Sequence, residues 1–152
     1  MTFIQNILVP VDFTESSLYA ARYAASLAQK HNARLYVLHV KEPFPVHGRI
    51  VAGSLEYVQE HRMIKEQTEL PKVIPAEIKN SIAVEEVQVS GIPAYRVIVE
   101  KARQFNVDVI VMASQDRKGW LQFFKKNTTA QVIRNAPCSV FVVRLPEGKA
   151  DK

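Results

Sequence analysis

Short apolar runs rich in β-branched residues constrain the fold of this chain most strongly. Two of them, residues 7–11 (ILVPV) and 107–112 (VDVIVM), contain almost no polar side chains. A strand with this composition is covered on both faces, as strands in the interior of a parallel sheet are. The chain is therefore expected to fold around a parallel sheet with helices on both of its faces.

Helical segments alternate with the apolar runs. Residues 15–31 follow Thr14, a suitable N-cap, and stop before Asn32. Their apolar positions recur at helical spacing: Leu18, Ala21, Ala25 and Ala28. Residues 34–40 (RLYVLHV) then form a second β-prone run. Strand, helix and strand make a βαβ unit, whose two strands are parallel and joined by a right-handed crossover.

The remaining elements complete one doubly wound domain. Residues 41–53 are expected to form a loop beyond the second strand, and residues 147–152 a flexible tail. The other expected elements are helices at 54–70, 76–80 and 94–105, the last ended by Asn106, and strands at 84–89, 107–112 and 139–143. This order predicts an α/β fold with a single five-stranded parallel sheet in the order 3-2-1-4-5, occupying residues 1–146.

Composition and charge narrow the classes of function. The chain has 152 residues, a formal charge of +5 and one cysteine, Cys138. Its cations are mostly interspersed with acids, so we expect no nucleic-acid partner. We also expect no membrane partner and a cytoplasmic location, since no apolar run approaches the roughly 20 residues of a membrane span and the start does not resemble a secretory signal. The lone cysteine excludes an internal disulfide and a cysteine cluster for metal within one chain.

Four segments carry a resemblance to a known family. They are ILVPVDFTESS (7–17), VSGIPAYRVIVEKA (89–102), DVIVMASQDRKG (108–119) and NAPCSVFVVR (135–144). Together they resemble the universal stress protein family, from Ile4 to Arg144. The resemblance implies a role in stress resistance, with protein partners that the sequence does not name. It also implies a homodimer that often forms through the last strand, which would place Val140 and Val142 in the subunit contact.

The resemblance also implies where a ligand would bind. Doubly wound sheets bind ligands at the carboxyl edge where the strand order reverses, which here follows Val9 and Val111. In the nucleotide-binding branch of the family, adenosine triphosphate (ATP) lies there, with Gly-x2-Gly-x9-Gly-Ser/Thr after strand four. The matching residues here are Ala113, Asp116, Lys126 and Asn127, so the chain resembles a branch that lacks this glycine motif. A Cβ obstructs the close approach of main-chain N–H groups to phosphates, and the Asp116 carboxylate would repel them.

The adenosine side of the family's site is retained. Pro10 and Asp12 match the positions that hold base and ribose, Val40 matches the apolar wall, and Met112 and Ser114 match the approach to the phosphates. The full set of candidate nucleotide-binding residues is Pro10, Val11, Asp12, Val40, Met112, Ala113, Ser114, Arg117, Lys126, Asn127 and Thr128. No cofactor is certain from the sequence, and ATP is the one that the resemblance makes possible.

Several of these residues have an alternative structural interpretation. Asp12 could accept a ribose hydroxyl or stabilise the first turn of the following helix. Arg117, Lys118, Lys125 and Lys126 could bind phosphate, although a solvated loop surface is the more ordinary explanation of a charge run. Thr128 and Gln131 form a Thr-x-x-Gln capping box, which could leave free N–H groups for an anion or serve the helix alone.

Catalytic and metal-binding patterns are missing from the sequence. The four histidines lack metal-ligand spacing, Cys138 follows a proline at a strand entry, and no nucleophile elbow or phosphate-binding loop occurs. The leading hypothesis is therefore a homodimeric stress-response module, not an enzyme and without a metal, with weak or absent ATP binding. An ATP-binding form that uses side-chain cations is the second. An electron-transfer or hydrolytic α/β enzyme is the third.

Overall fold

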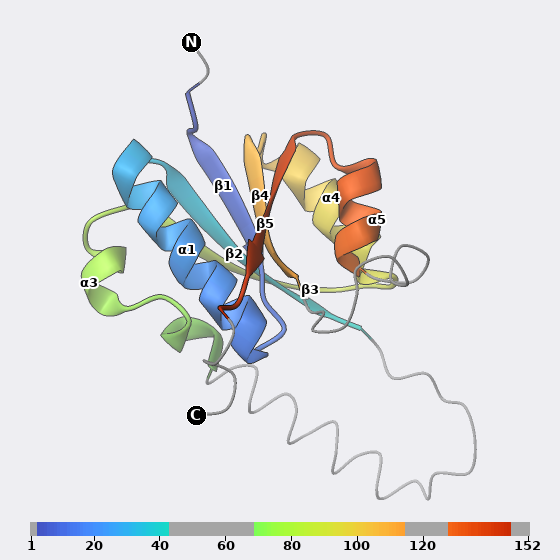
Figure 1. Ribbon diagram of the computed structural model, residues 1–152, viewed down its shortest axis with the longest axis horizontal. Coiled ribbons are helices and arrows are strands. Elements are labelled where there is room, and N and C mark those ends of the chain that lie inside the picture. The colour runs from blue at the N-terminus through green and yellow to red at the C-terminus, as the bar shows by residue number, and fades with distance from the viewer. Residues whose placement is uncertain (1–2, 43–68, 115–127, 147–152) are drawn as a thin grey trace, which may run out of the picture.

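A five-stranded parallel sheet runs through the protein in the order β3-β2-β1-β4-β5 (Figure 1). The computed structural model describes residues 3–42, 69–114 and 128–146. The strands are β1 (Asn6–Pro10), β2 (Arg34–Lys41), β3 (Val84–Ser90), β4 (Val109–Ser114) and β5 (Ser139–Arg144). Each strand pairs with its neighbours in parallel. The predicted fold class and strand order are confirmed.

Helices cover both faces of the sheet. The helical elements are α1 (Glu15–His31), η1 (a 3-10 turn, Leu70–Lys72), α3 (Ala76–Lys79), α4 (Ala94–Gln104) and α5 (Thr128–Asn135). Figure 1 shows α4 and α5 packed on one face, while α1 and α3 lie on the other. Within the described ranges, no helix has the length and apolarity that crossing a bilayer would require.

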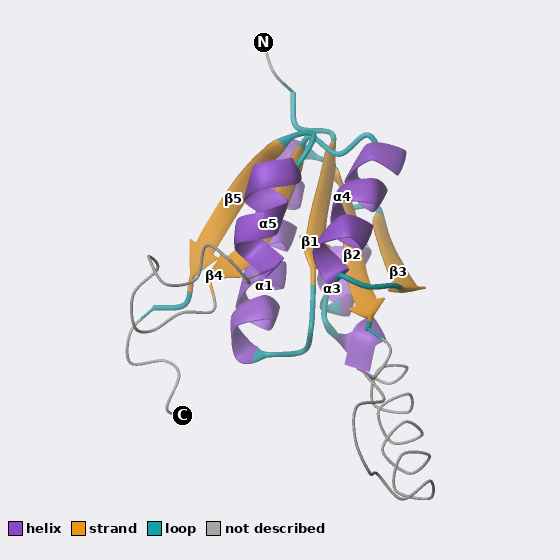
Figure 2. Cartoon of the chain, turned by 90° about the vertical axis from the view of Figure 1, so that its right-hand side faces the viewer, coloured by secondary structure: helices purple, strands orange, loops and turns teal. Residues whose placement is uncertain are grey.

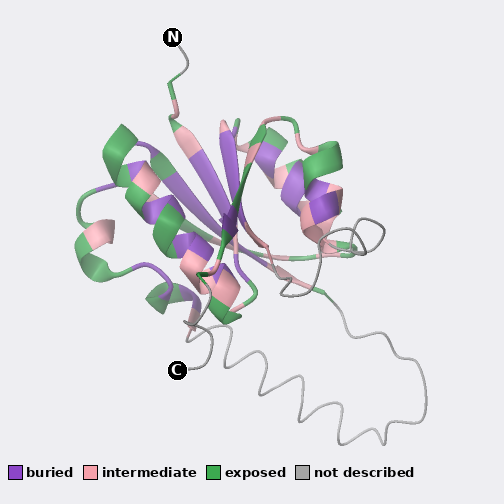
Figure 3. Ribbon diagram, viewed as in Figure 1, coloured by how far each residue is buried: buried purple, intermediate pink, exposed green. Residues whose placement is uncertain are grey.

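The core is divided by the sheet into two clusters. Along β2, Leu35 and Val37 belong to the cluster beneath α1, whereas Tyr36 and Leu38 belong to the cluster beneath α4 and α5. This alternation follows from the two-residue period of a strand. The central strands are largely buried, as Figure 3 shows, and their burial decreases toward the carboxyl ends, at Pro10, Ala113 and Ser114.

Both ends of α1 are as the sequence predicts. The Oγ1 atom of Thr14 accepts a hydrogen bond from the backbone N–H of Ser17 at 3.3 Å, which is the N-cap arrangement. At the other end Asn32 has a left-handed backbone, with φ of 52°, and its N–H closes the last turn. Asn106 has a similar conformation after α4, with φ of 49°, and α4 ends at Gln104 instead of Phe105.

Several strand boundaries differ from the prediction by one or two residues. The fourth strand begins at Val109, not Val107, because the N–H of Val107 still donates to the carbonyl of Ala102 and so completes the turn after α4. The first strand spans Asn6–Pro10, one residue earlier than predicted, because its pairing with β2 begins at Asn6 and Arg34. These boundaries depend on backbone hydrogen bonds, which the pattern of apolar and polar side chains does not reveal.

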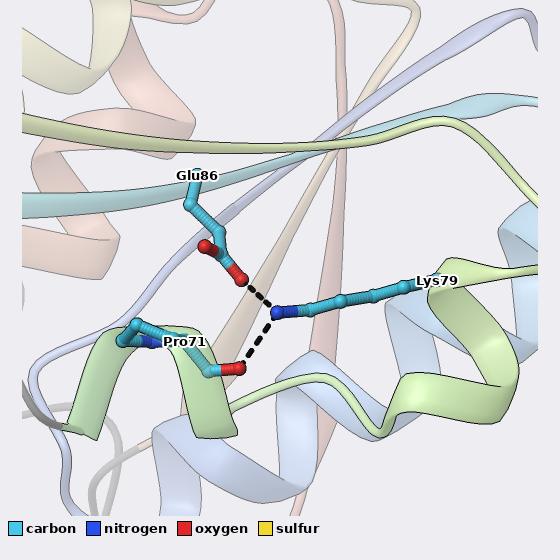
Figure 4. A network of polar contacts seen from close by, with 3 residues as sticks. All are labelled: Pro71, Lys79 and Glu86. Carbon is cyan, nitrogen blue, oxygen red and sulfur yellow. Dashed lines mark hydrogen bonds and ion pairs between the residues drawn. The ribbon is translucent and has the colours of Figure 1, made fainter.

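The connection between β2 and β3 is anchored by one lysine. Lys79 at the end of α3 donates from Nζ to the carbonyl of Pro71 at 2.6 Å and forms an ion pair with Glu86 of β3 (Figure 4).

The predicted helix over 54–70 is wrong at its end, since Leu70 already begins η1, where Pro71 cannot donate a helical N–H. The short helix predicted at 76–80 is found as α3, and Lys41, expected in a loop, is the last residue of β2. Residues 43–68 and the predicted tail, 147–152, lie outside the described residues.

Candidate functional site

The two central strands separate toward their carboxyl ends. The β1–β4 register consists of the pairs Ile7–Val109 and Leu8–Ile110, whereas β4 pairs with β5 as far as Ser114 and Arg144. Beyond Leu8, β1 stays with β2, and the N–H of Val11 donates to the carbonyl of Leu38 at 2.8 Å. Figure 2 shows the two halves of the sheet diverging at this end. This is the switch point at which doubly wound sheets bind ligands.

Most of the predicted site residues meet at this edge. Pro10 and Val40 are half-buried at the ends of β1 and β2, and the Asp12 side chain is exposed in the loop that follows β1. Met112, at 6% exposure, precedes the half-buried Ala113 and Ser114 at the end of β4. Val11 is buried, and Thr128 begins α5 in a half-buried position. Arg117, Lys126 and Asn127 fall outside the described residues.

Asp12 organises the turn between β1 and α1. Its Oδ1 atom accepts hydrogen bonds from the N–H of Thr14 at 3.0 Å and from the Thr14 hydroxyl at 2.5 Å. Its own N–H donates to the hydroxyl of Ser17 at 3.2 Å. Asp12 therefore does stabilise the start of α1, the structural alternative drawn from the sequence. Because its side chain is exposed at the switch point, the ribose contact stays a prediction.

His39 is a site residue that sequence reasoning missed. Its Nδ1 atom lies 2.8 Å from the carbonyl oxygen of Val11, and its ring centroid lies 4.6 Å from that of Phe13. A carbonyl only accepts, so Nδ1 carries the hydrogen and donates it. The available signal was the parallel register, because Pro10 pairs with Leu38 and the next residue of β2 must lie level with Val11.

The start of α5 is tied to the end of β4 by Thr129. Its Oγ1 atom donates to the carbonyl of Ala113 at 3.2 Å. The predicted capping box is wrong, because Thr128 is already the first residue of α5 and therefore not its cap. Two adjacent threonines are hard to distinguish from sequence, and it is the second one that contacts the preceding strand.

Cys138 lies in an environment that disfavours its thiolate. It is half-buried and packs against the core cluster beneath α4 and α5. Burial raises the pKa of the Cys138 thiol, and the nearby Asp108 carboxylate raises that pKa further, against a lowering by a backbone hydrogen bond at Ile110. A thiol reacts as its thiolate, so this environment favours a packing role.

Metal ligands do not gather in the part of the chain that the structure describes. No group of three or more His, Cys, Asp or Glu side chains comes together there in an arrangement that could hold an ion. His31 is exposed and His39 is buried against Val11, whereas His47 and His61 lie outside that part. Among the described residues, the switch point offers apolar surface from Pro10 and Val40, the carboxylate of Asp12 and backbone groups.

Comparison with known proteins identifies the family and agrees with the fold. The universal stress protein family model matches residues 4–144, so the chain belongs to the universal stress protein family. A universal stress protein of Methanocaldococcus jannaschii is 30% identical over 143 residues, covering 94% of this chain and 84% of that protein. The resemblance noted in the sequence is confirmed at the level of the family.

Solved structures show the same architecture. The universal stress protein UspA of Lactobacillus plantarum superposes with a TM-score of 0.71 at 26% identity, covering 95% of this chain and 100% of the other. A universal stress protein solved in complex with cAMP superposes with a TM-score of 0.70 at 23% identity, covering 93% of this chain and 98% of the other. Both share the fold described above.

Proposed function

We propose that the protein is a cytoplasmic stress-response binding module, not an enzyme, that holds the adenosine part of an adenine nucleotide at the switch point and binds ATP weakly or not at all. The observation that carries the proposal is the divergence of β1 and β4 after Leu8 and Ile110, with the adenosine-side residues gathered at that edge. The edge combines apolar surface with an exposed carboxylate, which suits a nucleoside.

The adenosine side has chemically matched groups. Pro10 and Val40 offer half-buried apolar surface on neighbouring strands, which suits the face of a purine ring. The exposed carboxylate of Asp12, one residue beyond the buried Val11, is a hydrogen-bond acceptor of the kind that binds ribose hydroxyls in doubly wound sheets. Asp12 is also held by its bonds to Thr14, so its position is fixed before a ligand arrives.

The phosphate side lacks the features of a triphosphate cradle. Ala113, at the first glycine position of the family motif, carries a Cβ, and its carbonyl accepts a hydrogen bond from Thr129. Asp116 and Lys126 stand at the next two glycine positions in the sequence. Without glycines the main chain cannot approach several phosphates closely, and a carboxylate repels them. A single phosphate makes smaller demands, and the structural relative solved with cAMP holds a nucleotide of that kind.

Titration calorimetry tests the proposal directly. We expect AMP and cAMP to bind at least as tightly as Mg-ATP, because the additional phosphates gain no cradle. Asp12→Ala should weaken AMP binding about tenfold, the equivalent of one hydrogen bond to a charged group. Glu100→Ala, at an exposed acid on α4, is the matched control and should leave binding unchanged. Absence of binding by all three nucleotides would refute the proposal.

The same titration decides the second candidate, ATP binding through side-chain cations. In that case Mg-ATP would bind much more tightly than AMP, because the positive charges of side chains would replace the glycine cradle. The double substitution Arg117→Gln and Lys126→Gln would then remove this difference in affinity. The cationic stretch of the sequence, from Asp116 to Lys126, is the observation that favours this candidate.

We further propose that the module is a homodimer joined through β5. This edge strand exposes Phe141 (46%) and Val142 (43%), which point to opposite faces of the sheet. Tyr23 of α1 lies beside Phe141, with ring centroids 5.7 Å apart, and Ile133 of α5 is also exposed. An apolar, uncovered edge strand is a template for pairing with a second copy about a two-fold axis.

The opposite edge is protected against such pairing. β3 carries the charged residues Glu85 and Glu86, and Lys79 of α3 forms an ion pair with Glu86. Charged residues on an edge strand oppose its association with another strand. One open and one protected edge support a closed dimer instead of a growing array.

A further inference from the structure

The carboxyl end of β2 holds a histidine in contact with the loop that carries Asp12. The His39 side chain is 4% exposed and lies against the β1–α1 loop, with Nδ1 2.8 Å from the carbonyl oxygen of Val11. An imidazole is costly to bury where a leucine or valine would fit, unless its polar atoms make specific contacts. The contact with Val11 therefore indicates why this position carries histidine.

Val11 is held by two successive residues of β2. Its N–H donates to the carbonyl of Leu38 at 2.8 Å, and its carbonyl accepts from His39. The carbonyl of Val11 belongs to the peptide unit that continues into Asp12. Both sides of Val11 are therefore fixed to β2, immediately before the carboxylate of the site.

The residue after Asp12 has an unfavourable backbone conformation. Phe13 has φ of 63°, a left-handed value that bulky residues adopt only when their surroundings impose it. The ring of Phe13 packs against that of His39, with centroids 4.6 Å apart. His39 thus contacts the loop on both sides of Asp12, through the Val11 carbonyl and through the Phe13 ring.

We infer that His39 is a positioning residue that sets the place of the Asp12 carboxylate for nucleotide binding. Its side chain is buried and acts through Val11 and Phe13. This inference rests on the proposed function, because the carboxylate is placed for a nucleotide. Its structural part, the control of the β1–α1 loop, can be measured in the free protein.

Two variants separate the hydrogen bond from the volume of the side chain. His39→Asn keeps an N–H donor at the position of Nδ1, because the asparagine amide has the same spacing from the backbone. His39→Leu fills the buried space without a donor. Val37→Ala is the matched control, since Val37 lies on the same strand, faces the same cluster and is fully buried, but its substitution removes no bond to the loop.

The first measurement is amide hydrogen exchange of Thr14 and Ser17, whose N–H groups are bonded within the loop to Asp12 and Thr14. We expect His39→Leu to accelerate their exchange about tenfold relative to amides of α4, the equivalent of one net hydrogen bond, and His39→Asn to restore it. Val37→Ala should lower the melting temperature without this local acceleration. Unchanged exchange in His39→Leu, or acceleration in His39→Asn equal to that in His39→Leu, would overturn the inference.

The second measurement is AMP affinity by calorimetry. We expect His39→Leu to lose about tenfold and His39→Asn to retain the original affinity, because the loop is again held. If the unmodified protein binds no AMP, the proposed function fails, while the exchange data still decide whether His39 holds the loop. If AMP binds and His39→Leu binds it equally well, the positioning role fails and the proposed function stands.

Discussion

The carboxylate of Asp108 holds the start of β1, accepting hydrogen bonds through Oδ2 from the N–H of Asn6 at 2.9 Å and from that of Gln5 at 2.8 Å. In return, the N–H of Asp108 donates to the carbonyl of Asn6 at 2.9 Å. These bonds fix the register of β1 against β4 at the amino edge, while the same two strands separate at the other edge. Asp108 therefore contributes to the position of the site from the far end of the sheet.

We expect Asp108→Ala to lower the free energy of unfolding by about 2–3 kcal/mol, because two backbone N–H groups lose a charged acceptor. Asp108→Asn keeps one carbonyl oxygen and should lose less. Urea unfolding measures both changes. Glu100→Ala, at an exposed position, should stay within about 0.5 kcal/mol, and an equally small effect of Asp108→Ala would contradict the assignment.

Gly91 leaves no room for a side chain. A Cβ built there would lie 2.6 Å from Cγ2 of Val97 in α4. We expect Gly91→Ala to destabilise the protein by about 1–3 kcal/mol through this overlap. Val97→Ala in the same chain should recover part of the loss, which a double-mutant cycle in urea would show as a coupling energy. Additive effects of the two substitutions would show that the overlap is not the cause.

The thiol of Cys138 should ionise at a higher pH in the folded protein than in the unfolded chain. Because burial and Asp108 raise the pKa of Cys138, the pH midpoint of its alkylation rate should be higher in the folded protein than in urea. The raised pKa also means that the stability contributed by the protonated thiol is fully present below the pKa of the unfolded chain and is lost as the pH rises from there through the higher pKa of the folded protein. Asp108→Asn should lower the midpoint in the folded protein. A midpoint no higher in the folded protein than in urea would refute the raised pKa of Cys138.

The β5 edge should control oligomeric state. We expect a dimer by light scattering at micromolar concentration, and Val142→Lys should give a monomer, because an ammonium group would be buried at the contact. Glu86→Gln, on the opposite edge, is the control and should leave the dimer intact. A monomeric unmodified protein, or a dimeric Val142→Lys variant, would refute the proposed contact.

The architecture could be predicted from sequence because it depends on local patterns. β-branched runs such as residues 7–11, helical periodicity and cap residues such as Thr14 and Asn32 each act within a few neighbours, and together they imply the observed strand order. The boundaries were less predictable. The late start of β4 depends on the bond from Val107 to Ala102, which is made by backbone atoms common to all residues.

The candidate site could be predicted in part. The family motif and the strand order place Pro10, Asp12 and Met112 at one edge, since the carboxyl ends of parallel strands coincide. The roles of His39 and Thr129 depend on contacts between separate elements, with Val11 and Ala113 respectively. A histidine inside an apolar run and a second adjacent threonine carry no local signal of such contacts.

The central place of β1 has a consequence for the order in which the protein is made. β2 follows β1 after a single helix, but the other neighbour of β1 does not exist until the residues from Val109 onward have been added. One edge of β1 therefore has no partner strand while β3 and α4 are being synthesised. The pairing of β1 with β4 is thus a long-range contact, and contacts of this kind slow folding.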